Sequence, residues 1–267
     1  MLNSVFSLKG FNLTEDTVLK NLIKSFEIQV PKRVVRPPPW NLDVVLKALS
    51  LAPFEPLRAS SFRNLLKKTL FLVSLASAKR VSELQALSYK FNQQGKDILL
   101  SYLPEFVAKT ETFNNPLPRE FRIKNLAVAV CPDDEERLLC PVRALLIFKE
   151  RMRNVTTRPR NLFVSPADRS KPLSKNALSY LLRETILQAH RSLPEHLLMP
   201  LRVKAHDIRG IATSLNLWRN KSVEAVLNAA SWRTPSVFAK HYLHDVERSD
   251  GDTFSLGPIV AAGDIVT

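Results

Sequence analysis

The spacing of apolar residues changes twice along this chain, and this pattern constrains the fold more than any other feature. Apolar residues recur at helical intervals from Trp40 to about Leu87, and again from Pro141 onward. Between these parts lie short β-rich segments separated by Gly, Pro and Asn residues, at 97–102, 105–108, 120–123 and 126–130. The pattern predicts a mainly α-helical protein with a small antiparallel β-sheet inserted between helices.

Capping residues indicate where the helices begin. A serine or threonine before an apolar run can accept from the free N–H groups of the first turn, and proline suits the first helical position. The first predicted helix covers 13–26, with Thr14 as its cap. Further helices are predicted from Phe62 (capped by Ser60 or Ser61), from Pro141 to about Arg153, from Ser174 to His190 and from His206 to Trp218. Two more begin after Ser222 and at Thr234.

A proline-rich basic segment, Pro31 to Pro39, follows the first predicted helix. It ends in three consecutive prolines, which force an extended backbone. We therefore expect a stiff linker and a domain boundary there.

The charge favours a polyanionic partner. The chain of 267 residues has 39 Lys+Arg against 25 Asp+Glu, a formal net charge of +14, and a pI near 10.0. The start resembles no signal peptide and the longest apolar run, Leu70–Ala78, is too short for a bilayer, so we expect an intracellular protein without membrane contact. Two cysteines give neither a disulfide framework nor a zinc module, and six glycines form no phosphate-binding loop motif.

One set of residues has the chemistry needed for metal-free attack on a phosphodiester. Two guanidinium groups can hold the non-bridging oxygens of the transition state, and an indole N–H can add a further hydrogen bond. A tyrosine can attack the phosphorus if a histidine accepts its proton, and a lysine can protonate the leaving 5′-oxygen. The candidates are Arg80, Arg209, Trp232, Tyr242, His206 and Lys109. Each of these residues taken alone is more often structural than catalytic. The interpretation rests on all six occurring together in this order.

The order and spacing of these residues resemble the catalytic domain of tyrosine recombinases, the phage integrase family. The matching signature reads Arg80, then Lys109, His206-x-x-Arg209, Trp232 and Tyr242. The resemblance covers roughly residues 40–245. The segments Lys79–Leu87, Phe106–Thr110 and Ala230–Tyr242 are most similar in sequence to recombinases of DIRS-type and Ngaro-type retroelements.

The resemblance implies a function and a role for each residue. Tyr242 would form a 3′-phosphotyrosyl intermediate, and Arg80, Arg209 and Trp232 would bind the scissile phosphate. Lys109 would be the general acid and His206 would assist as base, while Glu83 would orient the cluster from behind. The reaction would break and rejoin double-stranded DNA without metal, ATP, cofactor or small-molecule substrate. The protein would act as a homo-tetramer on DNA, in the nucleus if a eukaryotic retroelement encodes it.

Three departures from the family pattern accompany the match. Ser77-Ala78-Lys79 stands where a Thr-Gly pair usually precedes the first arginine, and Ala229-Ala230-Ser231 stands where a glycine is common before Trp232. Of the helical DNA-clamping domain that usually lies at the N-terminus of the family, we expect only the last helix, 13–26, to remain. We therefore expect residues 1–37 to be a remnant of that domain with its linker, 38–248 to be the catalytic domain, and 249–267 to be a tail.

Alternative functions remain open at this stage. The same fold could be a catalytically inactive, domesticated or decayed DNA-binding protein, or a type IB topoisomerase-like enzyme. A basic scaffold for RNA or acidic partners is a further reading. Beyond the catalytic set, a second group of cations is predicted to hold flanking DNA phosphates. This group comprises Lys32, Arg33, Arg36, Lys67, Lys68, Arg202 and Lys204.

Overall fold

The structure is a computed structural model of the 267-residue chain. It describes residues 16–29, 40–109, 118–126, 135–191, 203–218 and 263–264, together with 111, 113, 116 and 201. The chain divides into two compact units, Met1–Pro38 and Pro39–Thr267. In the described part, no helix is long and apolar enough to cross a membrane.

The first unit contains one described helix, α2 (Thr17–Gln29). Its first turn is capped by Asp16, whose carboxylate accepts a hydrogen bond of 3.0 Å from the Leu19 N–H. The sequence predicted a helix over 13–26 with Thr14 as its cap. Thr14 lies outside the described residues, and the described helix continues three residues beyond Phe26.

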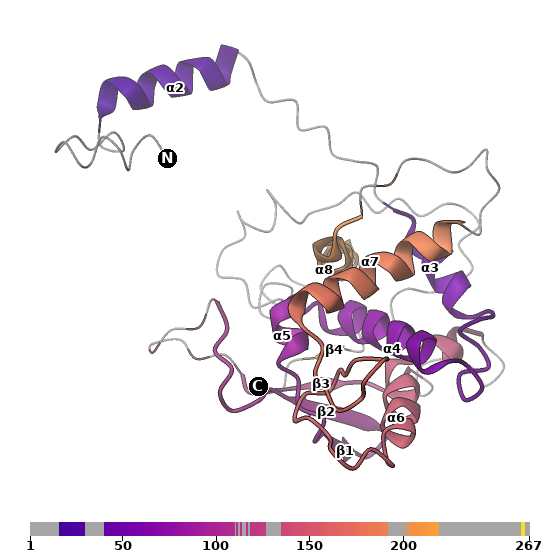
Figure 1. Cartoon of the computed structure of the whole chain (residues 1–267). Coiled ribbons are helices and arrows are strands. Elements are labelled where there is room, and N and C mark those ends of the chain that lie inside the picture. Colours follow the sequence, from indigo (N-terminus) through magenta and orange to yellow (C-terminus); the bar gives the residue numbers. More distant parts are fainter. Residues whose placement is uncertain are drawn as a thin grey trace. The chain divides into compact units, whose positions relative to one another are not determined.

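The second unit is built mainly from helices (Figure 1). They are α3 (Leu42–Leu49), α4 (Phe62–Ser77), α5 (Val81–Gln85), the 3₁₀ helix η2 (Glu135–Leu139), α6 (Pro141–Arg151), α7 (Lys175–Arg191) and α8 (Ala205–Trp218). Several predicted starts are confirmed, because Ser61 caps α4, Ser174 accepts from the Ala177 N–H, and Pro141 opens α6. The helices predicted after Ser222 and Thr234 lie outside the described residues.

A four-stranded sheet with strand order β1-β2-β3-β4 lies against this helical layer. Its strands are β1 (Asn92–Gln94), β2 (Asp97–Ser101), β3 (Glu120–Ile123) and β4 (Gly263–Asp264), and each neighbouring pair is antiparallel. The prediction of a mainly helical protein with a small antiparallel sheet is therefore confirmed. The last strand comes from the segment expected to be a tail, and it pairs with β3.

One predicted strand is wrong. Residues 105–108 form turns and irregular backbone between β2 and β3. The Phe106 N–H donates to the Leu103 carbonyl at 3.0 Å, and the Arg119 guanidinium donates to the Phe106 carbonyl at 2.6 Å. These bonds use the polar backbone groups that a neighbouring strand would need. The predicted strand over 126–130 lies almost entirely outside the described residues.

Helix α4 forms the centre of the core. Every residue from Leu65 to Ser77 is buried, and the helix packs against α6, α7 and α8 (Figure 1). On one side, the Trp40 and Phe71 rings meet edge to face with centroids 6.1 Å apart. Since α4 has so little exposed surface, polar side chains on it need partners from neighbouring segments.

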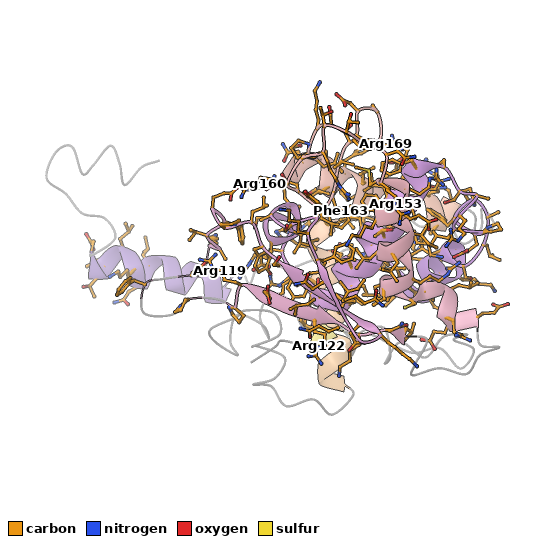
Figure 2. All side chains as sticks on the ribbon, turned by 90° about the horizontal axis from the view of Figure 1, so that it is seen from below. Arg119, Arg122, Arg153, Arg160, Phe163 and Arg169 are labelled. Carbon is orange, nitrogen blue, oxygen red and sulfur yellow. The ribbon has the colours of Figure 1, made fainter. Side chains whose placement is uncertain are left out.

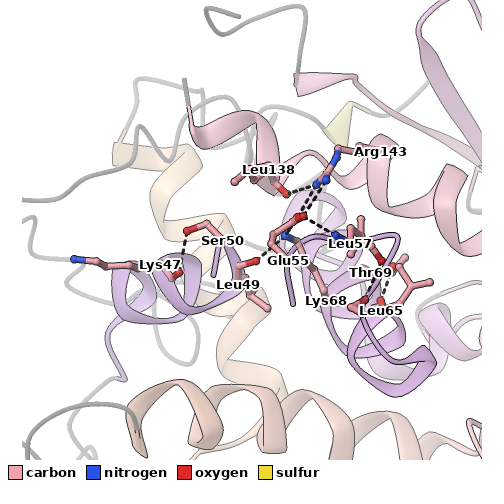
Figure 3. A network of polar contacts seen from close by, with 11 residues as sticks. Lys47, Leu49, Ser50, Glu55, Leu57, Leu65, Lys68, Thr69, Leu138 and Arg143 are labelled. Atoms are coloured by element: carbon pink, nitrogen blue, oxygen red, sulfur yellow. Dashed lines mark hydrogen bonds and ion pairs between the residues drawn. The ribbon is translucent and has the colours of Figure 1, made fainter. Parts of the chain in front are cut away.

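A buried ionic network supplies such partners for Lys68 (Figure 3). The Lys68 ammonium donates to the Glu55 carboxylate at 2.5 Å and to the Leu49 carbonyl at 2.6 Å. Arg143 on α6 donates to the same carboxylate through both terminal nitrogens, at 2.6 and 3.0 Å. Glu55 thus joins α4, α6 and the segment after α3.

Candidate active site

A left-handed turn at Ala78 links α4 to α5 and begins the candidate site. Ala78 has φ 50° and ψ 25°, and its N–H donates to the Ser74 carbonyl at 3.0 Å. This is the conformation that glycine adopts without a Cβ clash. Among the described residues, Ala78 is the one non-glycine residue with positive φ.

Replacing Ala78 with glycine is expected to stabilise the folded protein. Removing the Cβ relieves the left-handed strain, and this gain, about 1 kcal/mol, exceeds the entropy that glycine loses on folding. Urea unfolding would measure it. The control is Ala76→Gly inside α4, which should destabilise by about 1 kcal/mol. Equal destabilisation by both substitutions would contradict the explanation.

The Glu83 carboxylate binds the two arginines that the sequence analysis selected. Its Oε2 accepts from the Arg80 backbone N–H at 2.5 Å and so caps the first turn of α5. Its Oε1 lies 3.4 Å from Arg80 Nη1, while its Oε2 lies 3.7 Å from Arg209 Nη1 on α8. The side chains of Glu83 and Arg209 are 1% and 4% exposed, whereas that of Arg80 is 19% exposed. The cluster therefore has its more open side at Arg80.

Lys79 adds a third cation that the sequence analysis gave no role. Its side chain is buried, and its Nζ lies 5.1 Å from the centroid of the Phe121 ring on β3. Burial lowers the pKa of Lys79 to about 8, with Glu83 raising it and Arg209 and Arg80 lowering it further. The sequence feature that could have drawn attention to Lys79 is its position beside Arg80, directly after the apolar run that ends at Ala78.

Tyr102 is a tyrosine beside this cluster, at the end of β2. Its ring contacts Phe106 and Phe121, with centroids 5.2 and 5.8 Å away. Burial raises the pKa of Tyr102 well above its ordinary value, and the charge of Glu83 raises it further against the opposing effect of Arg209 and Arg80. A hydroxyl that resists ionisation is a poor nucleophile, so this tyrosine does not fit that role.

His206 lies in the first turn of α8, three residues before Arg209, and its side chain is exposed. Residues three apart on a helix share a face, which puts this imidazole on the same side of α8 as the guanidinium. Asp207 holds the start of the helix by accepting from the Lys204 N–H at 2.8 Å. Lys204 is exposed next to this turn.

Lys109 is exposed on a turn between β2 and β3. Glu111 fixes this turn by accepting from the Ala108 N–H at 3.0 Å and by pairing with Arg119 at 3.0 Å. Within the described residues, no ion pair connects Lys109 to the Arg80–Glu83–Arg209 cluster. The structure therefore leaves its predicted role untested.

Several predicted site residues lie outside the described part of the chain, and their roles stay predictions. They are Trp232, Tyr242, Lys32, Arg33, Arg36 and Arg202. Among the residues that are described, no three His, Cys, Asp or Glu side chains gather closely enough to hold a metal ion.

The prediction that Lys67 and Lys68 bind DNA phosphates is wrong. The Lys68 side chain is fully buried and bound to Glu55 (Figure 3). The Lys67 side chain is 4% exposed, lies 3.0 Å from a Glu184 carboxylate oxygen and donates to Gln188 at 2.9 Å. Both ammonium groups are inside the protein, where no phosphate backbone can reach them.

Many surface arginines also have partners within the protein. Figure 2 labels arginines on β3 and in the segments beside it and after α6. Arg160 pairs with Glu105 at 2.9 Å, Arg122 donates to Gln94 at 3.2 Å, and Arg169 lies 4.2 Å from the Phe62 ring centroid. Part of the net charge of +14 thus belongs to cations that already have partners within the protein.

Solved structures that are similar to this chain include two of lambda integrase. One is a lambda integrase(75–356) dimer bound to a COC′ core site, with 12% identity over 77% of this chain and 58% of that chain, at a TM-score of 0.43. The other is a lambda integrase dimer bound to a COC′ core site, with 13% identity over 82% of this chain and 51% of that chain, at a TM-score of 0.46. The chain thus spans between half and three fifths of those integrase chains. No protein-family model and no curated protein matches the sequence.

Proposed function

We propose that this protein cleaves and rejoins DNA strands as a tyrosine recombinase does, with Tyr242 as the nucleophile. The observation that carries the proposal is the meeting of Arg80 and Arg209 at the buried Glu83 carboxylate, at 3.4 and 3.7 Å. The two arginines come from helices far apart in the sequence. Two guanidinium groups fixed side by side form a site for the charged oxygens of a phosphodiester.

Glu83 prepares this site for its substrate. Two neighbouring cations repel each other, and a shared carboxylate between them offsets that repulsion. Because the carboxylate also caps α5, the same contact fixes the backbone from which Arg80 projects. A site held rigid before the phosphate arrives needs no rearrangement in the transition state.

The proposed reaction proceeds in two balanced steps. The Tyr242 oxygen attacks the scissile phosphorus, its proton passes to His206, and a 3′-phosphotyrosyl bond forms as the bond to the 5′-oxygen breaks. Lys109 gives a proton to that oxygen, while Arg80, Arg209 and Trp232 stabilise the phosphoryl charge. In the second step, a 5′-hydroxyl of another strand attacks the phosphotyrosine and gives its proton to Lys109. His206 returns a proton to the leaving tyrosine oxygen and so restores the tyrosine. The phosphotyrosyl bond conserves the energy of the phosphodiester, so ATP is not required, and the arginines supply the charge stabilisation that a metal would otherwise provide.

Covalent trapping tests this proposal. The full chain is mixed with a pool of double-stranded DNA of randomised sequence, nicked so that the cleaved strand loses a short fragment and cannot be religated. Wild-type protein is expected to form a protein–DNA adduct that survives denaturing electrophoresis and forms equally in EDTA. Tyr242→Phe should form none, because phenylalanine has no hydroxyl to attack phosphorus.

The matched control is Tyr180→Phe, since the Tyr180 ring on α7 is exposed and has no part in the mechanism. This variant should form the adduct at the wild-type level. DNA binding without an adduct in wild type would contradict the proposal and indicate a catalytically inactive DNA-binding protein. Sequencing the trapped DNA would identify the target site.

The finer proposals follow from the resemblance in sequence. We propose that the chain is a recombinase of DIRS-type or Ngaro-type retroelements, because the sequences of Lys79–Leu87, Phe106–Thr110 and Ala230–Tyr242 resemble theirs. Such a recombinase works in the nucleus, on double-stranded DNA, as a tetramer. Lys67 and Lys68 are buried, so Lys204, which is exposed next to α8, is the described cation of the predicted group that we still propose to hold a flanking phosphate.

A further inference from the structure

Arg158 lies on a tyrosine ring and has no polar partner within the described part of the protein. Its guanidinium carbon is 4.4 Å from the centroid of the Tyr89 ring, and its Nε is buried without a hydrogen bond. Among the described residues, no oxygen accepts from its terminal nitrogens and no carboxylate pairs with it. A guanidinium has five N–H donors in a rigid plane. The ring therefore holds this side chain in place while its donors stay available.

A second stacked arginine shows what is unusual about Arg158. The Arg169 guanidinium carbon lies 4.2 Å from the Phe62 ring centroid, and its Nη1 also donates to the Arg151 carbonyl at 3.5 Å. That arginine thus links two parts of the protein. Arg158 makes the aromatic contact without such a link. Since its side chain is half-buried rather than enclosed, an anion from solvent can reach it and accept from its donors.

Backbone contacts attach the segment of Arg158 to the end of α5. Ser88 and Asn161 form an antiparallel bridge, and the Asn161 amide donates to the carbonyl of Gln85, the last residue of α5, at 2.7 Å. Helix α5 has five residues, about 7.5 Å of helix, and begins directly after Arg80. One short helix thus connects this segment to the candidate active site.

The surroundings of Arg158 are positively charged. The Tyr89 N–H donates to the Arg160 carbonyl at 3.0 Å, which places a second arginine beside the ring. Glu105 pairs with Arg160 at 2.9 Å and so balances its charge, whereas the neighbouring Lys90 is exposed. The charge of Arg158 therefore remains unbalanced at this surface, which favours a polyanion as the ligand.

We propose that Arg158, positioned by the Tyr89 ring, binds a phosphate of the DNA backbone outside the cleavage point. This inference rests on the proposed function and adds a DNA contact that the recombinase motif does not contain. Each strand of a duplex has a phosphate about every 3.4 Å along the axis, so DNA held at Arg80 has further phosphates within the length of α5. A guanidinium fixed before binding loses little freedom on contact, and a phosphate contact positions DNA without reading its sequence.

Salt-dependent DNA binding tests this contact. The affinity of the full chain for one fluorescently labelled duplex is measured by anisotropy from about 50 to 300 mM salt. Arg158→Gln should reduce the slope of log affinity against log salt by about 0.9, the value of one phosphate contact, and weaken binding by about 5-fold at physiological salt. Tyr89→Leu keeps the charge but removes the ring that positions it, so this variant should bind about 3-fold more weakly.

The matched control is Arg169→Gln, which removes the same charge and also an aromatic contact, and should bind DNA like wild type. Thermal unfolding checks that each variant is folded. Wild-type slope and affinity in Arg158→Gln overturn the inference, and so does an equal loss in Arg169→Gln, which would be an effect of net charge. Unchanged DNA binding with weaker self-association in sedimentation also overturns it and assigns Arg158 to a contact between protein chains.

If Arg158→Gln is unfolded, Tyr89→Leu decides, and wild-type affinity in that variant overturns the inference. All of these results leave the covalent adduct of the wild-type protein, and thus the proposed function, intact. A wild-type protein that does not bind DNA removes both.

Discussion

Replacing Glu83 with glutamine is expected to reduce both adduct formation and stability. Glutamine can still accept a hydrogen bond from the Arg80 N–H, so the local backbone is retained, but the negative charge between Arg80 and Arg209 is lost. The two arginines then lose the carboxylate that they share, and the side chain of one of them, Arg209, is only 4% exposed. Removing one member of such a pair destabilises the fold by about 3–5 kcal/mol. The misaligned arginines should slow adduct formation by about 100-fold or more.

Urea unfolding and the trapping assay measure the two effects. Glu105→Gln is a suitable control, because Glu105 pairs with Arg160 at a site where both side chains are about 60% exposed. An exposed pair contributes about 0–1 kcal/mol, so this variant should be close to wild type in both assays. A Glu83→Gln protein with wild-type stability would show that the carboxylate is not what holds the two arginines together.

Replacing Glu55 with glutamine is expected to destabilise the protein by a similar amount, about 3–5 kcal/mol at pH 7. Here the loss leaves Lys68 fully buried without its carboxylate and Arg143 without its two-pronged contact. Glu55 has no part in the proposed reaction, since none of its partners belongs to the phosphate site. The folded fraction of Glu55→Gln should therefore cleave DNA normally, which separates it from Glu83→Gln.

The effect of Glu55→Gln should depend on pH. Burial alone would raise the pKa of Glu55, but hydrogen bonds with Arg143 and Lys68 outweigh burial and hold the pKa below its ordinary value of 4.5. The folded state therefore binds this proton less readily than the unfolded state, so the stabilising contribution is present above about pH 4.5 and decreases in more acidic solution. The difference in unfolding free energy between wild type and variant should shrink from pH 7 to pH 3. Glu150→Gln, at the exposed pair with Arg58, is the control.

The helices could be predicted because their signals are local. Ser61, Pro141 and Ser174 mark helix starts within a few residues, and apolar spacing marks the turns that follow. The segment 105–108 was mistaken for a strand for the complementary reason. Its β-rich composition is local too, but whether it pairs depends on Arg119, whose side chain takes up the Phe106 carbonyl.

The candidate site was predictable where a sequence motif contains the residues, and unpredictable where partners come from elsewhere. The motif selected Arg80, Glu83 and Arg209, which meet in the structure. From the sequence, Lys67 and Lys68 on α4 were expected to hold flanking phosphates. Spacing on one helix cannot show that carboxylates from the segment after α3 and from α7 cover the other faces. The burial of Lys79 could not be predicted for the same reason, because the Phe121 ring that covers it comes from β3.

The single carboxylate of Glu55 also has a consequence for local motions. It binds Lys68 on α4 and Arg143 on α6, while Lys68 in turn binds the Leu49 carbonyl at the end of α3. If one of these three segments opens, the other two lose a buried contact at the same time. They should therefore detach together as one cooperative unit rather than fray separately, and amide protons deep in α4 should exchange with solvent only through that shared opening.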